Sequence, residues 1–139
     1  MNEEVAAANF TNEGGVFGTT RFLKNVMGMW LLERCREEWK SNNIETSYED
    51  LIDAAFEMDT IGLIFPDDPR FVNPPSMLEL IGSQMAEMGQ AVSQDPAFIA
   101  KMIFDSLALR YASVLKTAGD LTGTDLTRIE LLGGGGRNR

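Results

Sequence analysis

The fold of this chain depends on the stretch Asn9–Glu33, whose sequence is NFTNEGGVFGTTRFLKNVMGMWLLE. Its first ten residues are rich in glycine and amide side chains, which predicts a loop, because glycine adopts backbone angles that other residues avoid. Thr19 or Thr20 then supplies a hydroxyl that can cap a helix. The apolar residues that follow recur at helical spacing and form one broad face. The stretch therefore predicts a glycine-rich loop that leads directly into a helix over residues 19–40.

Asn25 and Gly28 lie off the apolar face of that predicted helix, three residues apart and therefore adjacent. An amide beside a bare patch of helix backbone is an arrangement that could hold a polar ligand. The alternative is structural: Gly28 admits a neighbouring helix and Asn25 bonds a loop. Spacing alone leaves both interpretations open and favours the structural one.

Three further helices are predicted from capping residues and apolar periodicity. Ser47 and Ser76 are each followed three residues later by an acidic residue, which is typical of a capping box. Asp95 and Pro96 suit the cap and the first position of the last helix, and Gly119 is expected to end it. The predicted ranges are 47–58, 76–88 and 96–118.

Two short strands complete the prediction. Leu63–Phe65 is short and apolar, which favours a buried strand, and Arg128–Leu132 alternates enough for another. Prolines exclude a helix or central strand from the connector 66–75, and residues 1–8 read as a weakly ordered lead-in. With no internal repeat or linker, 139 residues predict one domain that is mainly α, with about four helices and one or two short strands.

The charge of the chain limits its partners. Its 12 basic and 21 acidic residues give a net charge of −9, and the basic residues do not gather in a stripe. Nucleic acids and anionic membranes need clustered positive charge, so neither is an expected partner. A bound nucleotide would need Mg²⁺ or another domain to supply positive charge. The first residues lack the pattern of a signal peptide and no apolar run could span a bilayer, so a cytoplasmic setting is expected.

The reactive side chains exclude several kinds of site. The chain has one cysteine, Cys35, and no histidine, so it lacks a Cys–His catalytic pair and the usual donors of a zinc site. Cys35 falls in the first helical pattern and is expected to be a core or near-core residue. Asp67 and Asp68 suggest a metal, but hard cations want more oxygen ligands than this. We therefore read the pair as a turn and predict no metal site.

The chain closes on a glycine run, Gly133–Gly136, followed by Arg-Asn-Arg. A strand followed by such a run can bring backbone N–H groups against a nucleotide, because no side chain intervenes. A glycine run at the end of a chain is more often a flexible tail, and the residues alone favour that interpretation. The run matches neither the P-loop nor the dinucleotide-binding pattern.

Five segments together resemble the C-terminal half of the FGGY carbohydrate kinases: NFTNEGG, LKNVMGMWLLE, FVNPPSM, IFDSLALRYASVL and LLGGGGRN. The resemblance covers about residues 7–139. The LKN-x-MG-x-W and NPPSM motifs are similar to the rhamnulokinase branch, while the others are shared more widely. The resemblance implies a parent protein with the α/β actin-like, ribonuclease-H-like ATPase fold. It also implies phosphorylation of a ketose hydroxyl with MgATP, which in that branch is O1 of L-rhamnulose.

The resemblance also implies binding residues. Asn25, in the LKN motif, would contact the sugar, and Gly134 with Gly135 would lie against ATP. Asn138 matches the asparagine after the run and would help hold the adenosine end. Glu33 stands where the family often has a glutamine associated with ATP. On one helix, Asn25 and Glu33 would be about 12 Å apart, which suits a sugar at one end and a nucleotide at the other.

Finally, the resemblance implies that residues 1–139 are a partial C-terminal domain. The first phosphate loop and the catalytic aspartate belong to the family's N-terminal domain, so no catalytic residue is expected in this chain. Exposed apolar surface and self-association are expected of such a fragment. Two alternatives stay open: a non-catalytic helical interaction module, and an FGGY kinase for another ketose or polyol.

Overall fold

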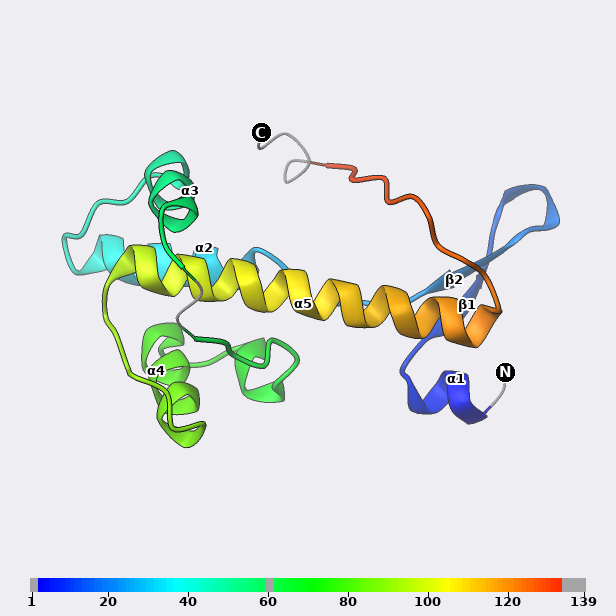
Figure 1. The fold of residues 1–139 in the computed structure, drawn as a ribbon, viewed down its shortest axis with the longest axis horizontal. Coiled ribbons are helices and arrows are strands. Elements are labelled where there is room, and N and C mark those ends of the chain that lie inside the picture. The colour runs from blue at the N-terminus through cyan, green and yellow to red at the C-terminus, as the bar shows by residue number, and fades with distance from the viewer. Residues whose placement is uncertain (1–2, 60–61, 134–139) are drawn as a thin grey trace. The chain divides into compact units, whose positions relative to one another are not determined.

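The computed structural model describes residues 3–59 and 62–133, and within these ranges the chain is mainly helical, as predicted (Figure 1). Five α-helices and a two-stranded sheet occur there. The chain divides into two units, one formed by Met1–Val26 with Tyr111–Arg139 and the other by Met27–Arg110. The long helix α5, Pro96–Thr122, contributes residues to both units.

The first unit begins with a short helix, α1, Glu3–Ala7. The prediction of a weakly ordered lead-in is therefore wrong at these residues. Glu3 and Glu4 lie in the first turn, where negative charge is favoured by the helix dipole. The turn closes because Asn9, with φ of 56°, lets its own N–H donate to Ala6 O at 2.9 Å.

A β-hairpin replaces the predicted helix start. Strand β1, Thr11–Gly14, pairs antiparallel with β2, Thr20–Leu23, so that Thr11 faces Leu23. The chain reverses through a 3-10 turn, η1, Val16–Gly18, in which Gly18 has φ of 72°. Gly15 N–H donates to Thr19 O at 2.7 Å and closes the loop. Cross-strand pairing, which local periodicity does not report, thus takes these residues out of the predicted helix.

Helix α2, Trp30–Ser41, is the remaining part of the first predicted helix. Its buried face carries Leu31, Leu32, Cys35 and Trp39, each at most 1% exposed. The prediction that Cys35 is a core residue is confirmed. Burial raises the pKa of its thiol to about 12, so the side chain stays protonated and unreactive at neutral pH.

Helices α3, Tyr48–Phe56, and α4, Met77–Glu87, begin at the predicted caps. The Ser47 hydroxyl accepts from Asp50 N–H at 3.0 Å, and the Ser76 hydroxyl accepts from Glu79 N–H at 3.1 Å. Each cap satisfies one of the N–H groups that the first turn leaves unpaired. These two helix starts are confirmed.

Helix α5 begins as predicted but ends later. Asp95 Oδ1 accepts from Phe98 N–H at 3.0 Å. The predicted end at Gly119 is wrong, since the helix continues to Thr122 and Gly123, with φ of 65°, follows it. Gly119 serves a different purpose. A Cβ there would lie 3.0 Å from Thr124 O, so the glycine lets the chain fold back and lets Thr124 N–H donate to Gly119 O at 3.2 Å.

Neither predicted short strand forms. Residues 63–65 and 128–132 are outside any ladder, because no other described segment pairs with them. The connector 66–75 is neither α-helix nor strand, as predicted, and its Pro69–Val72 forms a single 3-10 turn, η2.

One hydrophobic core lies in the unit Met27–Arg110. It joins the buried faces of α2, α4 and the first half of α5, together with the connector residue Phe71. Its most deeply buried large side chains include Trp39, Phe71, Met77, Ile81, Met85, Ile99 and Ile103. Three of these are from α4, including Met77 and Met85, so these two methionines serve in core packing.

Candidate functional site

Asn25 lies just after β2 and not on a helix, which contradicts its predicted placement. The preceding Lys24 donates from Nζ to Ala8 O at 2.7 Å, and its ammonium lies 5.3 Å from the centre of the Phe10 ring. Phe10 in turn stacks on Phe22 at 4.6 Å. These contacts hold the end of β2 and leave the Asn25 side chain exposed.

The predicted spacing of Asn25 and Glu33 along one helix is wrong. Pairing with β1 draws residues 20–23 into a strand, so α2 begins only at Trp30. Asn25 belongs to the first unit and Glu33 to the second. The structure therefore does not support the predicted arrangement, in which one helix would carry Asn25 at the sugar and Glu33 at the nucleotide.

Glu33 lies in the first turn of α2 and is held by two neighbours. The Tyr48 hydroxyl donates a short hydrogen bond to Glu33 Oε2, and Arg36 Nη1 donates to the same oxygen at 3.1 Å. The hydrogen bond from Tyr48 lowers the pKa of Glu33, and Arg36 lowers it further against the effect of burial. Burial and the bond to Glu33 raise the pKa of Tyr48. Its hydroxyl therefore stays protonated at neutral pH and donates a hydrogen bond to Glu33.

Arg36 joins this pair to the segment before α3. Its guanidinium lies 4.0 Å from the centre of the Tyr48 ring, and its Nη2 donates to Thr46 O at 3.2 Å. Its Nε is buried and has no hydrogen-bond partner among the described residues. The negative charge of Glu33 is therefore compensated locally.

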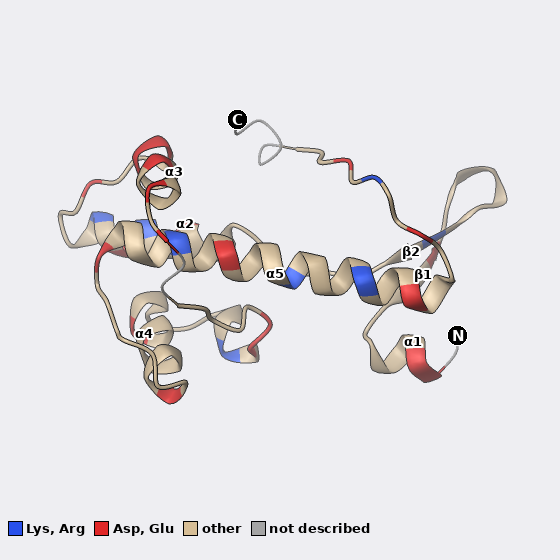
Figure 2. Ribbon diagram, in the orientation of Figure 1, with Lys and Arg blue, Asp and Glu red and all other residues tan. Residues whose placement is uncertain are grey.

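A pocket of about 610 Å³ opens beside Glu33, lined by one face of α2 and by residues 45–50. Four acidic and two basic side chains line it, with Thr46 and Ser47: Glu33, Glu37, Glu45, Asp50, Arg36 and Lys40. Figure 2 shows α3 with acidic residues and without a basic residue. Such a lining favours ligand groups that donate hydrogen bonds over bare phosphate.

The predicted nucleotide-binding residues Gly134, Gly135 and Asn138 lie outside the described residues. Their assignment to ATP stays a prediction.

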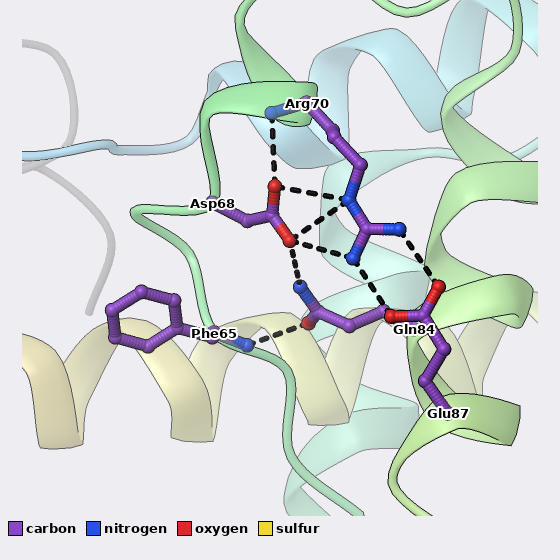
Figure 3. Close-up of polar contacts among 5 residues, drawn as sticks. All are labelled: Phe65, Asp68, Arg70, Gln84 and Glu87. Atoms are coloured by element: carbon purple, nitrogen blue, oxygen red, sulfur yellow. Dashed lines mark hydrogen bonds and ion pairs between the residues drawn. The ribbon is translucent and has the colours of Figure 1, made fainter.

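An arginine-centred network, which sequence reasoning missed, organises the connector (Figure 3). Asp68 accepts from Arg70 Nη2 at 2.7 Å, from Nε at 3.0 Å and from the backbone N–H at 2.9 Å. The same guanidinium donates to both oxygens of Glu87 at 2.7 and 2.8 Å. Bonding to Arg70 lowers the pKa of Asp68 to about 2 and also lowers that of Glu87.

The adjacent aspartates are therefore both engaged by arginines, since Asp67 forms an ion pair with Arg110 of α5. Within residues 3–59 and 62–133, no group of three or more acidic, cysteine or histidine side chains could hold a metal ion. The sequence Asp68-Pro69-Arg70 could have predicted this ion pair, because an aspartate that caps a turn can bind the arginine two residues later.

Side chains replace the missing strand partner of residues 63–65. Gln84, only 4% exposed, accepts from Phe65 N–H at 2.7 Å and donates to Asp68 at 3.0 Å (Figure 3). Gln90 exchanges two bonds with Leu63, both 2.7 Å. Ser106 accepts from Ile64 N–H at 2.9 Å. The buried Ile64 N–H would otherwise lack a partner, which explains why a serine occurs on the buried face of α5.

Glu38 of α2 forms hydrogen bonds with the NPPSM motif. Glu38 Oε2 accepts from the Ser76 hydroxyl at 2.7 Å, and Oε1 accepts a short bond from Met77 N–H. A carboxylate at this position compensates the positive end of the α4 dipole. The helix that carries Glu33 therefore also carries the anchor of the NPPSM motif.

The described helices include none with the length and apolar content that a membrane span requires. The longest, α5, carries lysine, arginine and aspartate along its course (Figure 2).

Known proteins resemble the whole of this chain. The model of the FGGY family of carbohydrate kinases, C-terminal domain, matches residues 1–139. A protein named rhamnulokinase from Bacteroides thetaiotaomicron is 46% identical over 139 residues, which is 99% of this chain and 28% of that protein. Rhamnulokinases from Pectobacterium atrosepticum and Pectobacterium carotovorum are each 43% identical over 136 residues, 97% of this chain and 27% of theirs. The chain thus spans little more than a quarter of these relatives, and it belongs to the FGGY family of carbohydrate kinases.

Proposed function

We propose that this chain is part of an ATP-dependent sugar kinase that transfers a phosphoryl group to O1 of L-rhamnulose. The observation that carries the proposal is the 43–46% identity, over nearly all of the chain, to proteins named rhamnulokinase. The family match over residues 1–139 supports the wider class of carbohydrate kinase, within which another ketose or polyol is the alternative substrate.

In this proposal the two ligands use different parts of the chain. Asn25 contacts the sugar, and its exposed amide after β2 is free to turn toward a polyhydroxyl ligand. Glu33, Gly134, Gly135 and Asn138 bind ATP. The general base that accepts the proton of the sugar hydroxyl lies in the part of the enzyme that residues 1–139 do not cover.

Mg²⁺ enters the proposal bound to the nucleotide. The described residues do not provide a carboxylate cluster for it, and Mg²⁺ in kinases is held largely by phosphate oxygens and water. The metal would neutralise phosphate charge that this acidic chain does not. The proposed setting is the cytoplasm, with neither nucleic acid nor membrane as a partner.

Self-association of the isolated chain is also proposed. Large apolar side chains are exposed in the described residues, among them Phe17, Phe56 and Leu132, at 82–101%. Light scattering of the chain, compared with the complete protein, would reveal such association as a concentration-dependent mass.

A coupled assay of the complete protein with MgATP and a panel of ketoses and polyols tests the function. We expect turnover of L-rhamnulose with a specificity constant at least tenfold above that of other sugars, a ratio that differential binding of a single hydroxyl can supply. Preference for a different sugar would support the proposed kinase activity and reject L-rhamnulose as the substrate. Absence of phosphorylation for every sugar would reject the kinase.

A further inference from the structure

One of the two carboxylate oxygens of Glu33 is not engaged by the described residues. Both hydrogen bonds that it receives from described residues, from Tyr48 and Arg36, go to Oε2. Oε1 accepts none from that part of the chain, and the side chain is 44% exposed at the wall of the 610 Å³ pocket. An ionised carboxylate is an acceptor only. The ligand group that Oε1 binds must therefore donate a hydrogen bond.

The other walls of the pocket indicate which part of a nucleotide carries that donor. Besides Glu33, three more carboxylates line the pocket, against the cations of Arg36 and Lys40. Arg36 is already engaged by Glu33, Thr46 and the Tyr48 ring. Phosphate oxygens would meet an excess of negative charge here, whereas hydroxyl and amino groups would meet acceptors.

We infer that Arg36 and Tyr48 are positioning residues that orient Glu33 to accept a hydrogen bond from the nucleoside part of ATP, and not from its phosphate end. The donor is a ribose hydroxyl or the adenine amino group. The inference rests on the proposed function, which supplies ATP as the ligand.

The geometry explains why two positioning residues are needed. The guanidinium is held in its plane by the Tyr48 ring at 4.0 Å and by Thr46 O at 3.2 Å, and its Nε is buried. Tyr48 adds a second bond to the same oxygen of Glu33. Loss of either residue frees the Glu33 side chain to rotate and leaves its charge less compensated in an acidic pocket.

The first test is steady-state kinetics of the complete protein. Tyr48→Phe and Arg36→Met should each raise the KM for ATP about five- to tenfold, the usual effect of losing a charge-assisted hydrogen bond, while kcat and the KM for the sugar change less than about twofold. Lys116→Met is the control, because it removes one positive charge from an ion pair, with Asp120, whose members do not line the pocket. Equal effects of Lys116→Met and Arg36→Met would overturn the inference.

Rescue separates positioning from general structural damage. Glutamine at position 33 carries no charge to compensate, so in the double variant Glu33→Gln with Arg36→Met the KM for ATP should match that of Glu33→Gln alone. Purely structural damage by Arg36→Met would instead persist and multiply with the effect of Glu33→Gln. Such additivity would contradict the inference.

Nucleotide analogues identify the donor. ATP, 2′-deoxy-ATP, 3′-deoxy-ATP and purine riboside triphosphate, which lacks the amino group, are compared with the protein and with Glu33→Ala. We expect the KM penalty of Glu33→Ala to disappear for the one analogue that lacks the donor. If all three analogues keep the full penalty, Glu33 does not bind the nucleoside. Calorimetric binding of the same nucleotides reports on Glu33 even if no sugar is phosphorylated, so the failure of the proposed function is distinguishable from the failure of this inference.

Discussion

Asp68 shows how one residue of the connector depends on its partners. Its side chain is 15% exposed and accepts four bonds from Arg70 and one from Gln84. These bonds favour the ionised form and lower the pKa from its ordinary value of 3.8 to about 2. A carboxyl with a lowered pKa stabilises the folded state above its unfolded pKa and loses that contribution as the pH falls through its folded pKa.

The first prediction follows from that sign. The difference in unfolding free energy between the protein and Asp68→Asn should be constant above about pH 5 and shrink as the pH falls from about 4 toward 2. Asp53→Asn, an exposed site on α3 with no ion pair among the described contacts, is the control. Urea unfolding at a series of pH values measures both, and a difference that does not depend on pH would refute the role of Asp68.

Gln84 carries a second prediction at the residue scale. Gln84→Leu leaves the Phe65 N–H without its acceptor and removes a donor to Asp68, which should cost about 1–3 kcal/mol in unfolding free energy. Gln94→Leu makes the same chemical change at an exposed position and should cost much less. Equal losses in thermal unfolding would mean that the network of Figure 3 contributes nothing.

At the scale of elements, the β1–β2 hairpin differs most from the structure that the sequence predicts. Local apolar spacing after Thr19 is compatible with a helix, but residues 20–23 pair with 11–14 and Phe22 stacks on Phe10. A helix over the same residues would forfeit these cross-strand contacts. The reversal depends on Gly18, which is in the left-handed region of backbone angles.

The two glycines of the hairpin give a matched prediction. Gly18→Ala should destabilise the protein by about 1–2 kcal/mol, because alanine disfavours a φ of 72° even though its Cβ would meet no atom within 4 Å. Gly14→Ala, equally open but in β1, should be nearly neutral. Thermal unfolding distinguishes them, and equal effects would show that backbone angle is not what Gly18 provides.

At the scale of the whole molecule, Asn25, proposed for the sugar, and Glu33, one of the residues proposed for the nucleotide, belong to different units. Asn25 follows the hairpin of the first, and Glu33 begins the buried helix α2 of the second. Their effects should therefore separate kinetically.

We predict that Asn25→Ala in the complete protein raises the KM for the sugar about tenfold, as expected for one lost hydrogen bond, and leaves the KM for ATP unchanged. Glu33→Ala should do the reverse. Each variant is the control for the other in one kinase assay with both substrates varied. A similar rise of both constants in either variant would reject the separate assignments.

Much of the helical architecture was predictable because its determinants are local. The caps Ser47, Ser76 and Asp95 start three helices where predicted, since each side chain bonds a backbone group three residues away. The apolar stripes of α2 and α4, and the burial of Cys35, follow from helical periodicity. The family, too, was recognisable from motifs in the chain.

The sequence motifs suggested Asn25 and Glu33 as candidate site residues but did not predict their surroundings. Tyr48 lies 15 positions from Glu33, and Gln84 lies 19 from Phe65, so no local pattern reveals these bonds. The hairpin in place of a helix, the side-chain partners of residues 63–65 and the arginine network were likewise decided by tertiary structure. Sequence by itself determined what short-range bonding and periodicity can specify, whereas contacts between distant residues form only once the chain has folded and water has been excluded from between them.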